Sequence, residues 1–289
     1  MAHEPDEAER RDALLGDIDW TAPAPGQRAR RLPVPSGELA LIEVGDPSAE
    51  RVMLVPGATG SKEDFALMLA PLAEAGYLVQ AVDLAGQYES GQAGPLPGNR
   101  YDYRLFVDDL VALLEAGGPA HLLGYSFAGI IAQLVAVDRP DLVKSLALLS
   151  CPPESGNVFA TVKRIGWLSR GASPRVAAGL MIWGIRTNKN RVLPGRLDFV
   201  RARFALTNRD SVEDMVGLMF DVPDLGLTLR ESGLRSLVAV GRHDLWAVER
   251  HVAFAERIGA GLKVYDTGHS PCETAPHQLV RDLLALYRS

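Results

Sequence analysis

The chain has 289 residues, of which 47% are apolar and 23% charged, and a formal net charge of -6. This is the composition of an ordinary globular protein, with enough chain for one sizeable core or for a core that carries an inserted cap. The acidic balance argues against a general nucleic-acid-binding surface. Apolar runs are too short to span a membrane, the N-terminus lacks an apolar signal segment, and Cys151 and Cys272 have no metal-ligand spacing. We therefore expect a cytoplasmic protein with no membrane partner and no metal.

The first elements expected along the chain are an arm and a hairpin. Residues 1–27 are charged at first and rich in proline later, which predicts a loosely ordered N-terminal arm. Residues 28–34 and 38–44 alternate imperfectly between apolar and polar side chains around Pro35-Ser36-Gly37, which predicts two strands joined by a tight turn.

From residue 51 onward, short apolar runs alternate with segments of helical periodicity. The apolar runs lie at 52–55, 78–82, 121–123, 146–149, 237–240 and 262–265. Continuous apolar strands separated by amphipathic helices are typical of a parallel sheet covered on both faces. We therefore predict an α/β fold with a mostly parallel, doubly wound sheet, whose core comprises residues 28–150 and 229–289.

One long interval, residues 151–228, contains no convincing strand. It holds apolar helical fragments, and a structureless loop of that length is uncommon in a compact domain, so we predict a helical cap inserted between two strands. Between Cys151 and Gly226 the chain has eleven Lys or Arg and seven Asp or Glu, although the whole chain is acidic. One hypothesis is that the cap attracts an anionic substrate or the acidic carrier of a tethered acyl group. The plainer interpretation is a solvated helix surface.

The segment after the third apolar run is the strongest motif in the chain. An apolar run is followed by Gly124-Tyr125-Ser126-Phe127-Ala128-Gly129 and then by an apolar helical segment. Glycines on both sides relieve crowding at a sharp strand-to-helix turn, so Ser126 can present its hydroxyl at the carboxyl edge of the sheet, as a nucleophile elbow does. The alternatives are a buried serine in a tight connection or a degraded dinucleotide-binding loop.

Two further loops follow strands on the C-terminal side of the predicted cap. Gly241-Arg242-His243-Asp244 follows the run at 237–240, and Asp266-Thr267-Gly268-His269 follows the run at 262–265. Loops after parallel strands meet at one edge of a sheet, so Ser126, Asp244 and His269 should converge there. Histidine can accept the serine proton and the aspartate can fix its tautomer. Singly, Asp244 could be a turn residue and His269 a loop histidine; Asp266 is a rival acid, badly placed on the histidine's own loop.

The loop after the first buried run, Pro56-Gly57-Ala58-Thr59-Gly60, can supply donors for a developing negative charge. We assign the oxyanion donors to the backbone N–H groups of Ala58 and Phe127, with Thr59 as an additional donor. The alternative is a glycine-containing turn without a ligand. A phosphate-binding P-loop is excluded, because Gly60-Ser61-Lys62-Glu63 lacks the adjacent Gly-Lys-Ser/Thr.

Outside the predicted cap, the chain from Arg28 to its end resembles the α/β-hydrolase fold superfamily. The matching segments are GYSFAG, LVPGATGSKEDF, DLAGQYESG, GRHD and TGHS. Three positions depart from the common pattern. Pro56 stands where relatives often have His, Gln87 stands where they have the His of Gly-His-Gly-x-Ser, and Ala128 stands at the second elbow glycine. None of these departures removes a member of the triad.

The resemblance implies that Ser126 attacks an acyl carbon and that water activated by His269 releases the acid, with no cofactor. Epoxide- and haloalkane-type hydrolases would have Asp at the elbow. We predict a serine hydrolase of carboxylic esters or thioesters acting on a small-molecule substrate with an apolar acyl or aromatic group. A ligand-binding or signalling protein that retains the triad, and a carbon–carbon bond hydrolase or lyase, remain as alternatives.

Overall fold

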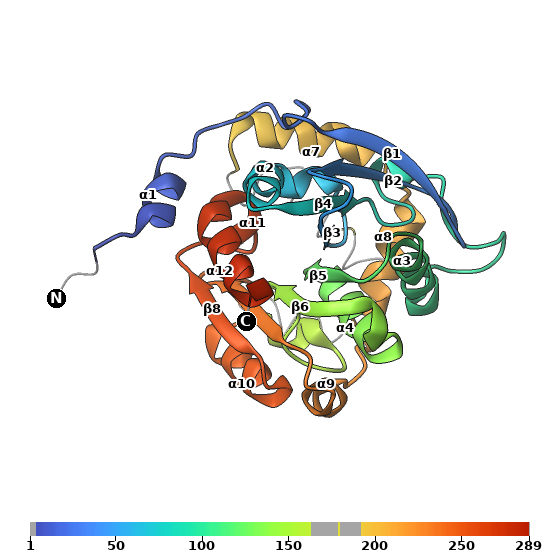
Figure 1. The fold of residues 1–289 in the computed structure, drawn as a ribbon. Coiled ribbons are helices and arrows are strands. Elements are labelled where there is room, and N and C mark those ends of the chain that lie inside the picture. The colour runs from blue at the N-terminus through green and yellow to red at the C-terminus, as the bar shows by residue number, and fades with distance from the viewer. Residues whose placement is uncertain (1–3, 163–178, 180–191, 289) are drawn as a thin grey trace.

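The computed structural model describes residues 4–162, 179 and 192–288 of the chain. Its centre is one eight-stranded sheet with the strand order β1-β2-β4-β3-β5-β6-β7-β8 (Figure 1). The strands are β1 (Arg28–Val34), β2 (Gly37–Val44), β3 (Glu50–Val55), β4 (Tyr77–Val82), β5 (Ala120–Tyr125), β6 (Val143–Leu149), β7 (Ser236–Gly241) and β8 (Gly261–Tyr265).

The sheet is antiparallel only at its N-terminal edge. β2 pairs antiparallel with β1 and with β4, and every pair from β4 to β8 is parallel. β4 and β5 are buried along their whole length, which explains why they appear in the sequence as uninterrupted apolar runs. The predicted α/β fold with a mostly parallel sheet is therefore confirmed.

Helices cover both faces of the sheet, as in a doubly wound fold. The helices α3, α4, α9 and α10 share one hydrophobic cluster, and α2, α11 and α12 share the other. The helices are α1 (Glu7–Ala13), α2 (Ala66–Glu74), α3 (Tyr103–Gly117), α4 (Phe127–Asp138), α7 (Pro194–Leu206), α8 (Arg209–Leu218), α9 (Gly226–Ser232), α10 (Val248–Ile258), α11 (Pro271–Thr274) and α12 (Pro276–Arg288), and four 3-10 turns are η1 (Lys62–Phe65), η2 (Tyr88–Ser90), η3 (Pro140–Leu142) and η4 (Val158–Thr161). None of the described helices is long and apolar enough to cross a bilayer.

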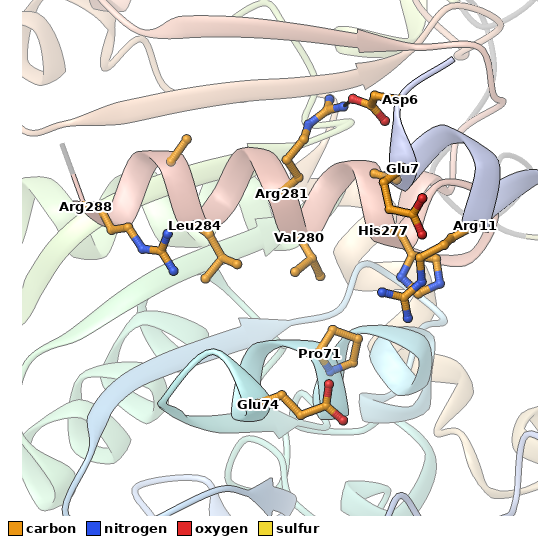
Figure 2. Close-up of a pocket in the computed structure, with 12 residues that line it drawn as sticks. Asp6, Glu7, Arg11, Pro71, Glu74, His277, Val280, Arg281, Leu284 and Arg288 are labelled. Carbon is orange, nitrogen blue, oxygen red and sulfur yellow. Dashed lines mark hydrogen bonds and ion pairs between the residues drawn. The ribbon is translucent and has the colours of Figure 1, made fainter. Parts of the chain in front are cut away.

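The N-terminal arm is attached to the core by helix α1. Asp12 accepts hydrogen bonds from the backbone N–H groups of His277 and Gln278, at 2.9 and 3.1 Å, and so caps the first turn of α12. Asp6, just before α1, forms an ion pair with Arg281 of α12. Beside this ion pair lies a pocket of about 560 Å³ between α1, α2 and α12 (Figure 2). The sequence predicted a loosely ordered arm from its charged and proline-rich composition. A carboxylate that caps a helix of another segment leaves no hydrophobic periodicity in the sequence, so this contact had no signal there.

The predicted cap, residues 151–228, lies partly outside the described residues, so the division into core and cap stays a prediction. Its described part contains η4, α7, α8 and the beginning of α9. Two arginines of α7, Arg196 and Arg203, are buried and form ion pairs with Asp64 of η1. At these two positions the expectation of a solvated helix surface is therefore wrong, because the arginines meet carboxylates of the core.

Asp109 of α3 is a buried carboxyl group whose titration should be visible in stability. It accepts hydrogen bonds from the backbone N–H and the hydroxyl of Ser36, at 3.0 and 2.6 Å. Burial raises the pKa of Asp109 from 3.8 to about 6. The folded state therefore holds the Asp109 proton more tightly than the unfolded state does. The stability that this protonated carboxyl group contributes below pH 4 is lost as the pH rises through about 6.

We accordingly expect Asp109→Asn to increase the free energy of unfolding by about 2 to 3 kcal/mol at pH 8 and to change it little at pH 4. An asparagine side chain can still accept from the Ser36 N–H while it donates to the hydroxyl. Denaturant unfolding at both pH values measures the difference. A gain of equal size at pH 4 and pH 8 would show that the ionised carboxylate is not its cause.

Candidate active site

The sharp strand-to-helix turn predicted from the sequence is present at the carboxyl end of β5. Ser126 lies between β5 and α4 with φ of 53° and ψ of -120°. This backbone region is costly for a residue other than glycine, and such strain is typical of functional turns. The Ser126 N–H donates to Leu149 O of the neighbouring strand at 2.8 Å, which holds the strained turn against β6.

Close packing explains the glycines on either side of Ser126. A Cβ atom at Gly124 would lie 2.4 Å from the carbonyl oxygen of Ala128, and one at Gly129 would lie 2.6 Å from the Cβ of Cys151. Both positions therefore exclude a side chain. Ala128 is fully buried at the position where the common pattern has its second glycine, so the tight contact falls on Gly129 instead.

Three side chains that are far apart in the sequence meet above the sheet edge. His269 Nδ1 lies 2.9 Å from Asp244 Oδ2, and His269 Nε2 lies 3.0 Å from Ser126 Oγ. Because an ionised carboxylate only accepts hydrogen bonds, Nδ1–H donates to Asp244 and Nε2 is left to accept the proton of the serine hydroxyl. The structure thus brings together the three residues that the sequence predicted to converge.

The environment of Asp244 favours its ionised form. The carboxylate also accepts a hydrogen bond from the backbone N–H of Trp246 at 3.1 Å. Burial acts to raise the pKa of Asp244, but the interactions with His269 and the hydrogen bond from Trp246 outweigh it, so the pKa lies below its usual value. The rival acid Asp266 has a side chain 82% exposed and lies against His243, with His243 Nε2 3.2 Å from its carboxylate. Asp266 therefore does not orient His269.

The loop of residues 56–60 lies directly against the elbow. A Cβ atom at Gly57 would lie 2.8 Å from the Cβ of Ser126, so only glycine allows this approach. The structure records no hydrogen bond from the N–H of Ala58 or Phe127 to another described residue. Phe127 is the first residue of α4, and the first N–H groups of a helix have no carbonyl partner within that helix. The Thr59 N–H donates to Gln87 Oε1 at 3.0 Å, so this N–H is not available as the additional donor predicted at Thr59.

Two residues around the site, Trp246 and His251, were not predicted from the sequence, and Gln87 stood out there only as a departure from the family pattern. The indole ring of Trp246 lies 6.1 Å from the His269 ring, centroid to centroid, and its Nε1–H donates to the carbonyl of Val158. His251 is fully buried on α10 with Nε2 3.9 Å from Asp244 Oδ1. Its spacing from Phe254 and Ile258 places it on the buried stripe of that helix, which was the available signal.

Proteins similar in sequence to this chain include an acetyltransferase component and an esterase. The chain is 33% identical over 237 residues to the dihydrolipoyllysine-residue acetyltransferase component of the acetoin cleaving system of Cupriavidus necator, which covers 76% of this chain and 59% of that protein. It is 26% identical over 183 residues to a pimeloyl-[acyl-carrier protein] methyl ester esterase of Aeromonas hydrophila, covering 61% of this chain and 63% of that protein. The chain thus spans less than two thirds of the length of either relative.

Solved structures show the same fold. A structure from a study of carboxylesterases of Nitrososphaera gargenis superposes with a TM-score of 0.71 at 20% identity, over 90% of this chain and 98% of that one. An epoxide hydrolase from Vigna radiata superposes with a TM-score of 0.72 at 14% identity, over 92% and 99%. A sequence model described as the alpha/beta hydrolase family matches residues 52–283. Because this match includes all three converging residues and most of the sheet, the chain belongs to the alpha/beta hydrolase family.

Proposed function

We propose that the protein is a serine hydrolase that cleaves a carboxylic ester or thioester through an acyl-enzyme on Ser126. The observation that carries this proposal is the position of His269, which contacts the Ser126 hydroxyl with one ring nitrogen and the buried Asp244 carboxylate with the other. A serine hydroxyl becomes a nucleophile when a neighbouring base accepts its proton, and the acid fixes that base in the required tautomer.

The proposed reaction has two steps. In the first, Ser126 Oγ bonds to the acyl carbon while His269 Nε2 takes its proton, and His269 then returns the proton to the departing alcohol or thiol. In the second, His269 takes a proton from water, whose oxygen attacks the acyl carbon, and the acid leaves as Ser126 regains its proton. The N–H groups of Ala58 and Phe127 would hold the negative charge on the carbonyl oxygen in both steps. These residues need no cofactor for the reaction.

The residue at the elbow separates this proposal from an epoxide hydrolase. The chain is 30% identical over 128 residues to a bifunctional epoxide hydrolase of Sus scrofa, but such enzymes are expected to have Asp at the elbow, where this chain has Ser126. A carbon–carbon bond hydrolase or lyase would use the same three residues, and product analysis distinguishes it. A ligand-binding or signalling protein would keep the triad without turnover.

For the substrate we propose a small to medium-sized apolar acyl or aromatic group, as a free molecule or tethered to a carrier. The name of the Aeromonas relative supports the tethered form, because that protein is an esterase of a carrier-bound methyl ester. Attraction of an anionic substrate by the cap is less well supported. All four arginines in its described part contact carboxylates, at positions 196, 201, 203 and 209. A kcat/KM that does not vary with ionic strength would remove this hypothesis.

Turnover of p-nitrophenyl esters from acetyl to decanoyl tests the proposal. We expect hydrolysis across the series, with the highest kcat/KM for a short or medium acyl chain and with covalent labelling by a fluorophosphonate probe. Thioesters of the same acyl groups, each with its products identified, show which leaving group the site prefers. A protein that neither turns over any member of the series nor reacts with the probe would contradict the proposal.

A further inference from the structure

The 56–60 loop, which carries the Ala58 donor, is held from two sides by residues of the cap region. One contact runs through Gln87, a fully buried side chain between β4 and η2. Gln87 Oε1 accepts from the Thr59 N–H at 3.0 Å, and Gln87 Nε2 donates to Ser211 Oγ of α8 at 2.7 Å. The Ser211 hydroxyl in turn donates to the carbonyl of Ala85 at 3.1 Å, so each polar atom in this buried chain has a partner.

The same chain of hydrogen bonds holds a strained part of the loop. Thr59 has φ of 65°, in the left-handed region that residues other than glycine adopt at a cost. The Thr59 N–H belongs to the peptide group that directly follows Ala58, and Gly60 N–H donates to Gly57 O at 2.9 Å to close the turn. The Gln87 carboxamide therefore fixes the peptide plane next to the candidate donor. A left-handed residue needs such a contact to persist.

The second contact is a buried ion pair immediately after the loop. Arg203 Nη1 of α7 donates to Ser61 Oγ at 3.1 Å and lies 2.6 Å from Asp64 Oδ1. The other carboxylate oxygen of Asp64 accepts from the Ser61 N–H at 3.2 Å. The Arg203 and Arg196 charges outweigh burial and lower the pKa of Asp64, so the carboxylate stays ionised. Helix α7 thus contacts the C-terminal end of the loop through Arg203, whereas α8 contacts Thr59 within the loop through Gln87.

We propose that Gln87 and Arg203 are positioning residues that make the 56–60 loop part of the surface on which α7 and α8 dock. These contacts then hold the donor geometry of the loop, so α7 and α8 contribute to the oxyanion hole through the Gln87 and Arg203 side chains in particular. The inference rests on the proposed function for its catalytic meaning. The coupling between helix and loop can be measured without turnover.

Hydrogen exchange resolved at the Thr59 amide tests the coupling directly. In Gln87→Met and in Ser211→Ala we expect this amide to exchange about 5-fold to 10-fold faster than in the wild type, because the loss of one hydrogen bond costs about 1 kcal/mol. The matched control is Asp214→Asn. Asp214 also lies on α8 and docks it through the Tyr101 N–H at 3.0 Å, but it does not touch the loop. We expect wild-type exchange at Thr59 in the control.

Steady-state kinetics on p-nitrophenyl acetate supply a second result. Both variants should lose about 10-fold to 100-fold in kcat, with KM changed by no more than about 3-fold, because a displaced donor acts mainly in the transition state. Unchanged exchange at Thr59 in folded Gln87→Met and Ser211→Ala, or equal acceleration in Asp214→Asn, would overturn the inference. If Gln87→Met does not fold, Ser211→Ala decides. If the wild type has no esterase activity, the proposed function fails but the exchange result still stands.

Discussion

Replacement of Ser126 by alanine should reduce kcat for ester hydrolysis by on the order of 10⁵-fold or more, which is the largest effect expected for any single substitution in this chain. The reason is that the hydroxyl is the proposed attacking group and lies 3.0 Å from His269 Nε2. Stability should change little, because Ser126 is half-buried and its strained backbone depends on its neighbours rather than on its side chain. The substitution should also abolish labelling by a fluorophosphonate probe.

Ser150 provides a matched control for this substitution. It follows β6 at the same edge of the sheet, it has φ of 44°, and its buried hydroxyl has no hydrogen-bond partner among the residues that the structure describes. Ser150→Ala should keep kcat and probe labelling within about 3-fold of the wild type, since truncation at a site without a hydrogen bond is nearly neutral. Persistent labelling of Ser126→Ala, with the probe mapped to another serine, would place the nucleophile elsewhere and refute the proposed mechanism.

The fold could be predicted from the sequence because its determinants are local and periodic. Buried parallel strands such as β4 and β5 appear as uninterrupted apolar runs, and the amphipathic helices between them repeat every three to four residues. The convergence of Ser126, Asp244 and His269 was predictable for a related reason. Each residue follows a strand, and parallel topology brings the loops after such strands to one edge.

The contacts that hold the loops in place could not be predicted in this way. Gln87 meets the Thr59 amide across 28 residues of chain, and no spacing rule connects a glutamine side chain to a distant backbone N–H. Helix α7 has Leu193 at its N-cap, without a side-chain acceptor, and Asp17 of the arm accepts from Gly195 N–H instead. Such polar contacts depend on the finished tertiary structure, because each forms only after the packed elements bring the partners together.

The distribution of charge on the cap could not be predicted from the sequence either. In the sequence, Arg196 looks like part of a basic, solvated surface. In the structure its guanidinium contacts Asp64 and Glu273, at 2.5 and 2.6 Å, and stacks on the ring of Trp20 at 4.3 Å. Arginine suits such a buried position because its planar group can bond two carboxylates and stack on an aromatic ring at once. Counting charges along the chain therefore overestimates the positive field that a substrate would meet.

Replacement of Asp244 by asparagine should lower kcat by on the order of 10⁴-fold while the protein stays folded. Asparagine has nearly the same shape, but its amide group can donate a hydrogen bond to His269 Nδ1 and so favour the tautomer in which Nε2 carries a proton. In that tautomer Nε2 cannot accept the proton of the Ser126 hydroxyl, 3.0 Å away. The loss should therefore appear in kcat for every ester of the series, and thermal unfolding should show that the variant remains folded.

Asp266→Asn is the control that separates the loss of the Asp244 contact from the loss of a negative charge near the site. Asp266→Asn removes the same charge from a neighbouring loop, but its side chain is 82% exposed and contacts His243 rather than His269, so kcat should stay within about 2-fold of the wild type. If the two substitutions lower kcat to a similar degree, the effect comes from the general charge around the site. A large loss in Asp244→Asn alone would mean that His269 depends on one buried carboxylate for its tautomer, as the 2.9 Å contact between them implies.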